Sequence, residues 1–332
     1  RGQLRFVDVT EAMGIAPDGL SWAAAAFDFD HDGDQDIFVA NDGGTIDFGN
    51  GPVVVNPQQL PMNVLLENRG NHFVDRAADL GVEGPYSSMG AVVEDFDRDG
   101  QFEMFIPDFG ANKLFKANAR GYGEVAAQFG LTAGRRLNDA CDAQTDSQLC
   151  LLVSWGAAFE DFNQDGKREL LLLNHEQTSG AAQPVQLFEQ QGDGFGERSL
   201  GLPNLPAHAL ISADFDHDGD LDWVASTVGE GLLVFENVAT DHCQQNWLTV
   251  TLNGQRSNRE GIGSAVEITR EDGSIQRRIL GYGGMPHASL PAEVNFGLGA
   301  HSVKRLRVTW PTGETTTVLS PKPQTRITVY QK

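Results

Sequence analysis

Four copies of one acidic loop constrain this chain more than any other feature. They read DFDHDGDQD at 28–36, DFDRDGQFE at 95–103, DFNQDGKRE at 161–169 and DFDHDGDLD at 214–222. Oxygen-bearing side chains stand at positions 1, 3, 5 and 9, and the glycine at position 6 permits a sharp turn that gathers those oxygens around one point. A hard cation such as Ca²⁺ takes several oxygen ligands at once. Four copies of one spacing therefore predict metal loops rather than metal-free acidic turns.

The spacing assigns a ligand set to each loop, in which the seventh residue acts through its backbone carbonyl. The predicted ligands are Asp28, Asp30, Asp32, Asp34 and Asp36 in the first loop, Asp95, Asp97, Asp99, Gln101 and Glu103 in the second, Asp161, Asn163, Asp165, Lys167 and Glu169 in the third, and Asp214, Asp216, Asp218, Asp220 and Asp222 in the fourth. We expect about four Ca²⁺ ions, bound most weakly in the second and third loops, where Asn163 removes a charge and Glu stands at position 9.

The charge of the chain fits cation binding and opposes two other classes of partner. Its 332 residues carry 46 acidic and 24 basic side chains, which gives a formal charge of −22. A negative field of this size opposes binding to nucleic acid and to anionic membranes. Because no apolar run approaches ~20 residues, we expect no transmembrane segment.

The loops belong to a longer repeat of short β-strands. An aromatic-led strand precedes each loop, then a strand of small apolar residues leads into it, and two more strands follow; the aromatic-led strands are FVDVTEAMGI (6–15), FVDRAADLGV (73–82), YGEVAAQFGL (122–131) and FGERSLGL (195–202). Position 2 of each loop is Phe, which should pack between sheets while the carboxylates face the ion. Four strands per repeat are typical of propeller blades.

We therefore predict an all-β fold in which residues 1–240 form a calcium-binding β-propeller with four visible blades. The strand at 4–10 should pair with the strand at 231–237, close the ring and remove the exposed sheet edge. A larger propeller, of which these blades are a part, is the alternative. From 245 to 332 the chain alternates apolar and polar residues between Gly and Pro turns, which predicts a small β-sandwich-like domain.

The loops and their flanking strands resemble the FG-GAP/VCBS repeat of calcium-binding β-propellers over residues 4–240. NWLTVTLNGQRSNREGIGSAVEI (246–268), with the later NFGLG and VTWPTG, resembles the ASPIC/UnbV module. The two together are similar to the arrangement in the cartilage acidic protein family. This resemblance implies an extracellular calcium-binding protein that acts by contacting other proteins or matrix.

Three functions remain open on the sequence alone. The first is a secreted binding or scaffold protein, because the acidic ligands are accounted for by the repeats and no recognised catalytic motif is present. The second is an enzyme or small-ligand binder at the channel mouth, where aligned inner strands bring together Trp22, Trp155 and His208, although core packing is the favoured explanation for large apolar residues there. The third is carbohydrate binding through exposed aromatic side chains and calcium. We expect no catalytic residue.

Location follows from the affinity expected of the loops, and cysteine pairing from the positions of the cysteines. Weak calcium loops fill at the millimolar concentrations outside the cytosol, so we expect an extracellular, secreted or cell-surface protein, or a periplasmic one. Cys141 and Cys150 stand in one polar segment and are predicted to form a disulfide, which leaves Cys243 over. An extracellular protein, matrix or glycan partner is expected.

Overall fold

The computed structural model describes residues 5–15, 19–47, 52–54, 62–132, 152–175, 182–238, 245–281 and 291–332. The fold is all-β. Among these residues the helices α1 (Ala77–Leu80) and α2 (Ala126–Phe129) are single turns that each end at a left-handed glycine, Gly81 or Gly130. No described helix has the length and apolar character that crossing a membrane requires.

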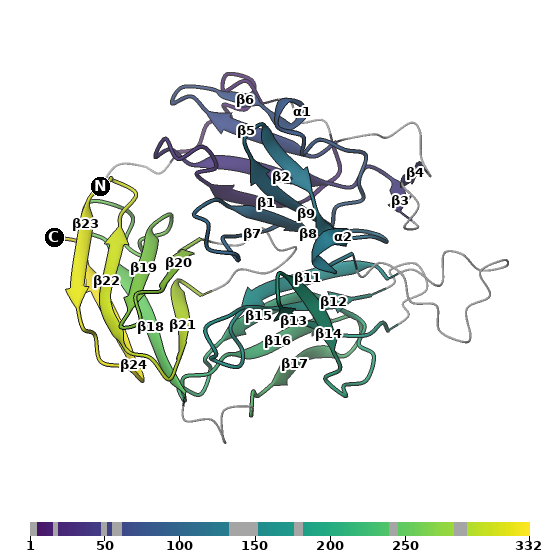
Figure 1. Cartoon of the computed structure of the whole chain (residues 1–332). Coiled ribbons are helices and arrows are strands. Elements are labelled where there is room, and N and C mark those ends of the chain that lie inside the picture. Colours follow the sequence, from purple (N-terminus) through teal and green to yellow (C-terminus); the bar gives the residue numbers. More distant parts are fainter. Residues whose placement is uncertain are drawn as a thin grey trace.

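Four antiparallel sheets follow one another along the first 238 residues (Figure 1). The first sheet contains β1 (Ser21–Phe27), β2 (Asp36–Asn41), β5 (Val64–Asn68) and β6 (Phe73–Asp75), and the second contains β7 (Val92–Glu94), β8 (Glu103–Ile106), β9 (Lys113–Asn118) and β10 (Gly121–Glu124). The third sheet contains β11 (Ser154–Glu160), β12 (Glu169–Asn174), β13 (Gln186–Gln191) and β14 (Gly194–Arg198). The fourth sheet contains β15 (Ala207–Ala213), β16 (Asp222–Thr227) and β17 (Gly231–Phe235). A short hairpin joins β3 (Thr45–Asp47) to β4 (Pro52–Val54). In each of the first three sheets the aromatic-led strand is the outer strand, as predicted.

Apolar side chains fill the space between successive sheets. Separate cores lie between the first and second sheets, between the second and third, and between the third and fourth. Phe96 from position 2 of the second loop is buried in one core, and Phe29 and Phe162 pack against the other two. The corresponding Phe215 is 48% exposed. The predicted packing of this ring is therefore correct for three loops and wrong for the fourth, which has no following sheet.

The predicted closure of the ring is wrong in this structure. The fourth sheet has three strands, and residues 5–15 lie outside every strand. Phe6 is 87% exposed, and Leu232 and Val234 on the free edge of β17 are 71% and 68% exposed. The N-terminal segment instead makes its backbone hydrogen bonds within a local turn and to the first sheet, where the Phe73 amide donates to the Met13 carbonyl at 2.7 Å.

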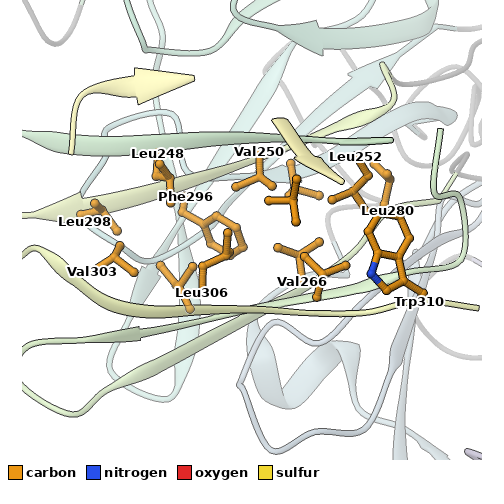
Figure 2. Packing of buried hydrophobic residues seen from close by; sticks show 14 residues of the cluster. Leu248, Val250, Leu252, Val266, Leu280, Phe296, Leu298, Val303, Leu306 and Trp310 are labelled. Carbon is orange, nitrogen blue, oxygen red and sulfur yellow. The ribbon is translucent and has the colours of Figure 1, made fainter. Parts of the chain in front are cut away.

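The C-terminal part of the chain folds into two facing sheets. One contains β21 (Glu293–Gly299), β18 (Asn246–Asn253) and β24 (Thr325–Tyr330), in which β18 and β24 are parallel; the other contains β20 (Ile275–Ile279), β19 (Ala265–Arg270), β22 (Val303–Thr309) and β23 (Thr315–Leu319). Their inward residues form one core around Leu248, Val266, Phe296, Leu306 and Trp310 (Figure 2). The alternation of apolar and polar residues that predicted a sandwich places these side chains on the inner faces.

This C-terminal module lies against the acidic loops of the repeat array. The Gly299 amide donates to the Gln164 carbonyl of the third loop at 2.9 Å. A Cβ atom on Gly297 would lie 2.0 Å from Oδ2 of Asp161, so the backbone of β21 touches the third loop directly. Arg278 on β20 reaches the last residue of β11, Glu160, at 2.9 Å. The module therefore contacts both the acidic loops and the ends of the inner strands.

Candidate metal centres

The four acidic loops connect the first strand of each sheet to the second, and they share one backbone shape. The glycine at position 6 is left-handed in each, with φ of 97°, 89°, 88° and 103°. The residue at position 4 is also left-handed, although it is not glycine: His31, Arg98, Gln164 and His217 have φ between 59° and 66°. Since non-glycine residues seldom adopt this region, its recurrence marks a turn that the whole loop imposes. The pattern of oxygen spacing did not predict this second left-handed position.

Backbone amides hold the loop carboxylates in place. In all four loops the amide of position 5 donates to the side-chain oxygen of position 3, at 2.9–3.3 Å. The amide of position 7 donates to the carboxylate of position 5, at 2.7–3.1 Å. The carboxylate of position 9 accepts a hydrogen bond from the amide of position 2, at 2.9–3.2 Å.

The arrangement fits a divalent cation. In the first, second and fourth loops, oxygens of positions 1, 3 and 5 lie within 4.8 Å of one another. In every loop the Oδ1 atom of position 1 (Asp28, Asp95, Asp161, Asp214) is buried and accepts no hydrogen bond. A buried carboxylate oxygen without a donor carries a large desolvation cost, which a coordinated cation removes. Calcium is the ion that this all-oxygen donor set suits best.

The raised pKa values of the loop carboxyls also fit cation binding. Burial raises the pKa of Asp36 to about 6 and that of Glu103 to about 8. Burial, together with the neighbouring carboxylates, raises the pKa of Asp161 to about 7 and that of Glu169 to about 9. Carboxyls that resist ionisation alone become good ligands once a positive charge compensates them.

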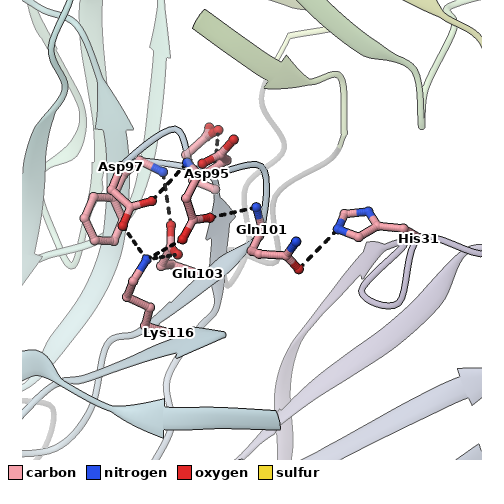
Figure 3. Close-up of polar contacts among 9 residues, drawn as sticks. His31, Asp95, Asp97, Gln101, Glu103 and Lys116 are labelled. Atoms are coloured by element: carbon pink, nitrogen blue, oxygen red, sulfur yellow. Dashed lines mark hydrogen bonds and ion pairs between the residues drawn. The ribbon is translucent and has the colours of Figure 1, made fainter. Parts of the chain in front are cut away.

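A side chain outside the second loop contacts its carboxylates, and the loop motif alone does not reveal it. In the second sheet Lys116 of β9 contacts Asp97, Asp99 at 2.8 Å and Glu103 at 3.3 Å (Figure 3). The corresponding strands carry Glu at this position, as Glu67 in the first sheet. The third strands VLLEN, KLFKA, QLFEQ and LVFEN, aligned at their fourth residue, place Lys116 where the other three strands carry Glu.

The structure brings together the aromatic residues predicted to surround the channel mouth. The Trp22 and Trp155 rings meet edge to face with centroids 5.5 Å apart, and the Trp155 and His208 rings lie 4.6 Å apart. Met89 packs in the same cluster. Trp155 is 2% exposed and donates from Nε1 to the His175 carbonyl at 2.9 Å. The contacts of these rings are those of side-chain packing, and a ligand-binding role stays a prediction.

The predicted disulfide and the remaining cysteine fall outside this picture. Cys141, Cys150 and Cys243 all lie outside the described residues.

Comparison with known proteins adds two families and one set of relatives. The profile of the FG-GAP-like repeat matches residues 28–106 and 161–225, and that of ASPIC and UnbV matches 254–332. The chain is 24% identical to cartilage acidic protein 1 of Mus musculus over 326 residues, which cover 95% of this chain and 45% of that protein. It is 27% identical to cartilage acidic protein 1 of Xenopus tropicalis over 267 residues, or 76% of this chain and 38% of that one. The chain thus spans less than half the length of these relatives.

Among solved structures, the similarity is weak. A lectin of Agrocybe aegerita that recognises non-reducing terminal N-acetylglucosamine superposes with a TM-score of 0.37 at 13% identity, covering 94% of this chain and 83% of that one. A score of this size does not establish a shared fold. The relationship of this chain to known proteins therefore rests on the FG-GAP-like repeats and on the ASPIC and UnbV module, not on this likeness.

Proposed function

We propose that this chain is a calcium-binding scaffold protein of extracellular-matrix type. It joins FG-GAP-like repeats to an ASPIC and UnbV module, and it is homologous to cartilage acidic protein 1 at about 24% identity. The observation that carries the calcium assignment is the repeated first-position carboxylate, whose Oδ1 atom is buried without a donor in all four loops. The homology carries the matrix assignment.

Calcium in this proposal is structural. The loops join the inner strand of each sheet to the next strand, and the third and fourth loops also contact the C-terminal module, through Gly299 and Arg326. An ion that binds only the folded chain at ~10 times its Kd adds about 1.4 kcal/mol per site. Several such sites contribute an amount comparable with the ~5–15 kcal/mol net stability of a typical protein.

The proposed setting is outside the cytosol, or in the periplasm, where weak calcium loops fill at ~10⁻⁴–10⁻³ M. The partner we propose is an extracellular protein, matrix or glycan. The charge of −22 opposes nucleic acid and anionic membranes. We propose a non-enzymatic role because the relatives are cartilage acidic proteins and repeat proteins, and because the acidic clusters of the first, second and fourth loops could hold a metal ion.

Thermal melting with and without a chelator tests the calcium role. At ~2.1 cal/mol/K per residue the unfolding entropy of a chain of this length is about 0.7 kcal/mol/K, so losing ~4 kcal/mol of binding energy lowers Tm by about 6 °C. Asp30→Asn should reduce the calcium-dependent shift, whereas Asp193→Asn, an exposed residue outside the loops, should not. A Tm that chelation leaves unchanged would refute a structural role for calcium.

A second experiment addresses the partner. Arrays of matrix proteins and of glycans, probed with the calcium-loaded and the chelated chain, separate a protein partner from a carbohydrate partner. Binding to neither array would contradict the scaffold proposal while leaving the calcium role intact.

A further inference from the structure

We propose that the second acidic loop carries its own cation, the ammonium group of Lys116, and that the repeat array therefore binds calcium at the first, third and fourth loops only. This inference rests on the calcium binding proposed above and changes its stoichiometry. It also assigns Lys116 a role that loop motifs do not show.

The position of the ammonium group is the first support. Lys116 Nζ contacts the side chains of positions 3, 5 and 9 of the second loop: Asp97, Asp99 at 2.8 Å and Glu103 at 3.3 Å (Figure 3). These are ligand positions that a bound ion would share. A single positive group that contacts three carboxylates at once stands where the loop geometry would place a metal ion.

Strand register makes this lysine equivalent to an acid in the other three sheets. Met104, the residue after the second loop, pairs with Phe115, which precedes Lys116. The residue after each remaining loop pairs in the same way with the residue that precedes an acid: Ile37 with Leu66 before Glu67, Leu170 with Phe188 before Glu189, and Trp223 with Phe235 before Glu236. Continuing the antiparallel register by one residue places each of these side chains opposite position 9 of its loop.

The charges across the strands explain the difference. Like charges directly opposite each other destabilise a strand pair, whereas opposite charges stabilise it. In the first, third and fourth sheets an acid faces the acid of position 9, so a bound cation relieves the repulsion. In the second sheet Lys116 faces Glu103, and the repulsion is absent without any ion. Counting positions 1, 3, 5 and 9 with this cross-strand residue, the formal charge is −5 in the first and fourth loops, −4 in the third and −3 in the second.

Other basic side chains near the loops do not act in the same way. Glu67 contacts Arg69 at 2.7 Å and Arg76 at 2.8 Å, so these arginines pair with the cross-strand acid. Arg326 reaches Asp214 at 3.4 Å, through the Oδ2 atom. In the first and third loops the same Oδ2 atom accepts the amide of the loop glycine, which places it away from the buried Oδ1. The Oδ1 atoms of Asp28, Asp161 and Asp214 therefore accept no hydrogen bond and are available to an ion.

Counting bound calcium in the full chain tests the stoichiometry. Equilibrium dialysis followed by elemental analysis should find three ions in the wild type and four in Lys116→Glu, whose new site should bind Ca²⁺ at least tenfold more tightly than the wild-type second loop. The matched exchange Glu236→Lys, at an exposed position, should reduce the count to two. Four ions in the wild type, or an unchanged count in Lys116→Glu, would overturn the inference.

Melting in a chelator separates this inference from calcium binding itself. Lys116→Met should lower Tm even without calcium, because three carboxylates then lose their counter-charge, whereas Glu236→Met should not lower it. An unchanged Tm for Lys116→Met in the chelator would refute the built-in cation. A wild-type chain that binds no calcium, but whose Lys116→Met variant melts early, would instead refute the proposed calcium function and the predicted count while upholding the role of Lys116.

Discussion

Replacing Arg278 by Met is the sharpest test of how the C-terminal module is held against the repeat array. Arg278 lies on β20, and its guanidinium contacts Glu160 at 2.9 Å and Glu94 at 3.7 Å, at the ends of β11 and β7. Burial alone would lower the pKa of Arg278, but the two carboxylates raise it on balance, so the side chain stays charged. Methionine is unbranched and uncharged, and it reproduces the aliphatic stem of arginine without the guanidinium, so it removes the ion pair while keeping the packing of the stem.

The magnitude follows from what remains after the substitution. Arg168 contacts Glu94 and donates to the Arg277 carbonyl at 2.9 Å, so one acid keeps a partner and Glu160 loses its own. Removing one member of a buried ion pair costs ~3–5 kcal/mol. A cavity lined by Glu94, Glu160 and Arg278 admits some solvent beside the pair, which favours the lower end, about 3 kcal/mol. With an unfolding entropy of about 0.7 kcal/mol/K for a chain of this length, Tm falls by about 4 °C.

Urea unfolding and calorimetry at pH 7 in calcium measure this loss, and a double-mutant cycle identifies its cause. Glu160→Gln combined with Arg278→Met should recover a large part of the cost, because no unpaired charge is left behind. A single variant within about 0.5 kcal/mol of the wild type would show that the pair is not buried in solution. A cost that the second substitution does not reduce would show that lost packing, not charge, is responsible.

Three further outcomes are expected. In chelator, the free energy of unfolding should fall as pH rises from about 4.5 to about 9, because Glu169, whose pKa is about 9 when folded, retains a proton that the unfolded chain releases; a urea series that shows stability rising with pH would contradict this. Gly297→Ala should lower the free energy of unfolding by ~1–3 kcal/mol, because its Cβ would lie 2.0 Å from the first carboxylate of the third loop. The control Gly281→Ala meets no atom within 4 Å and should change stability little. Equal effects of the two variants in urea unfolding would refute the close contact. Phe96→Ala should lower the free energy of unfolding by ~3–5 kcal/mol and Phe215→Ala by about 1 kcal/mol or less, because the first ring lies in a core and the second is half exposed. Equal losses of Tm in the two variants would show that a partner covers the fourth sheet in solution.

The repeat unit was predictable because its signals are local. The loop spacing, the small apolar strand that leads into each loop and the aromatic-led strand that precedes both recur in the sequence, and an aromatic-led strand forms the outer strand in the sheets of β1, β7 and β11. Closure of the ring was not predictable, because it depends on whether β17 and residues 5–9 meet in space. The matching sequence FVD at 6–8 and 73–75 shows only that both segments can form an outer strand.

The candidate sites show the same division. The amino-acid sequence by itself determined where the candidate calcium ligands lie, because nine consecutive residues set both the oxygen spacing and the turn that gathers them. Only the tertiary structure decided which charge faces each loop, Lys116 in the second sheet or an acid as at Glu67, and where the C-terminal module rests. Those contacts join separate strands, and Coulomb energy depends on distance in space rather than on separation along the chain.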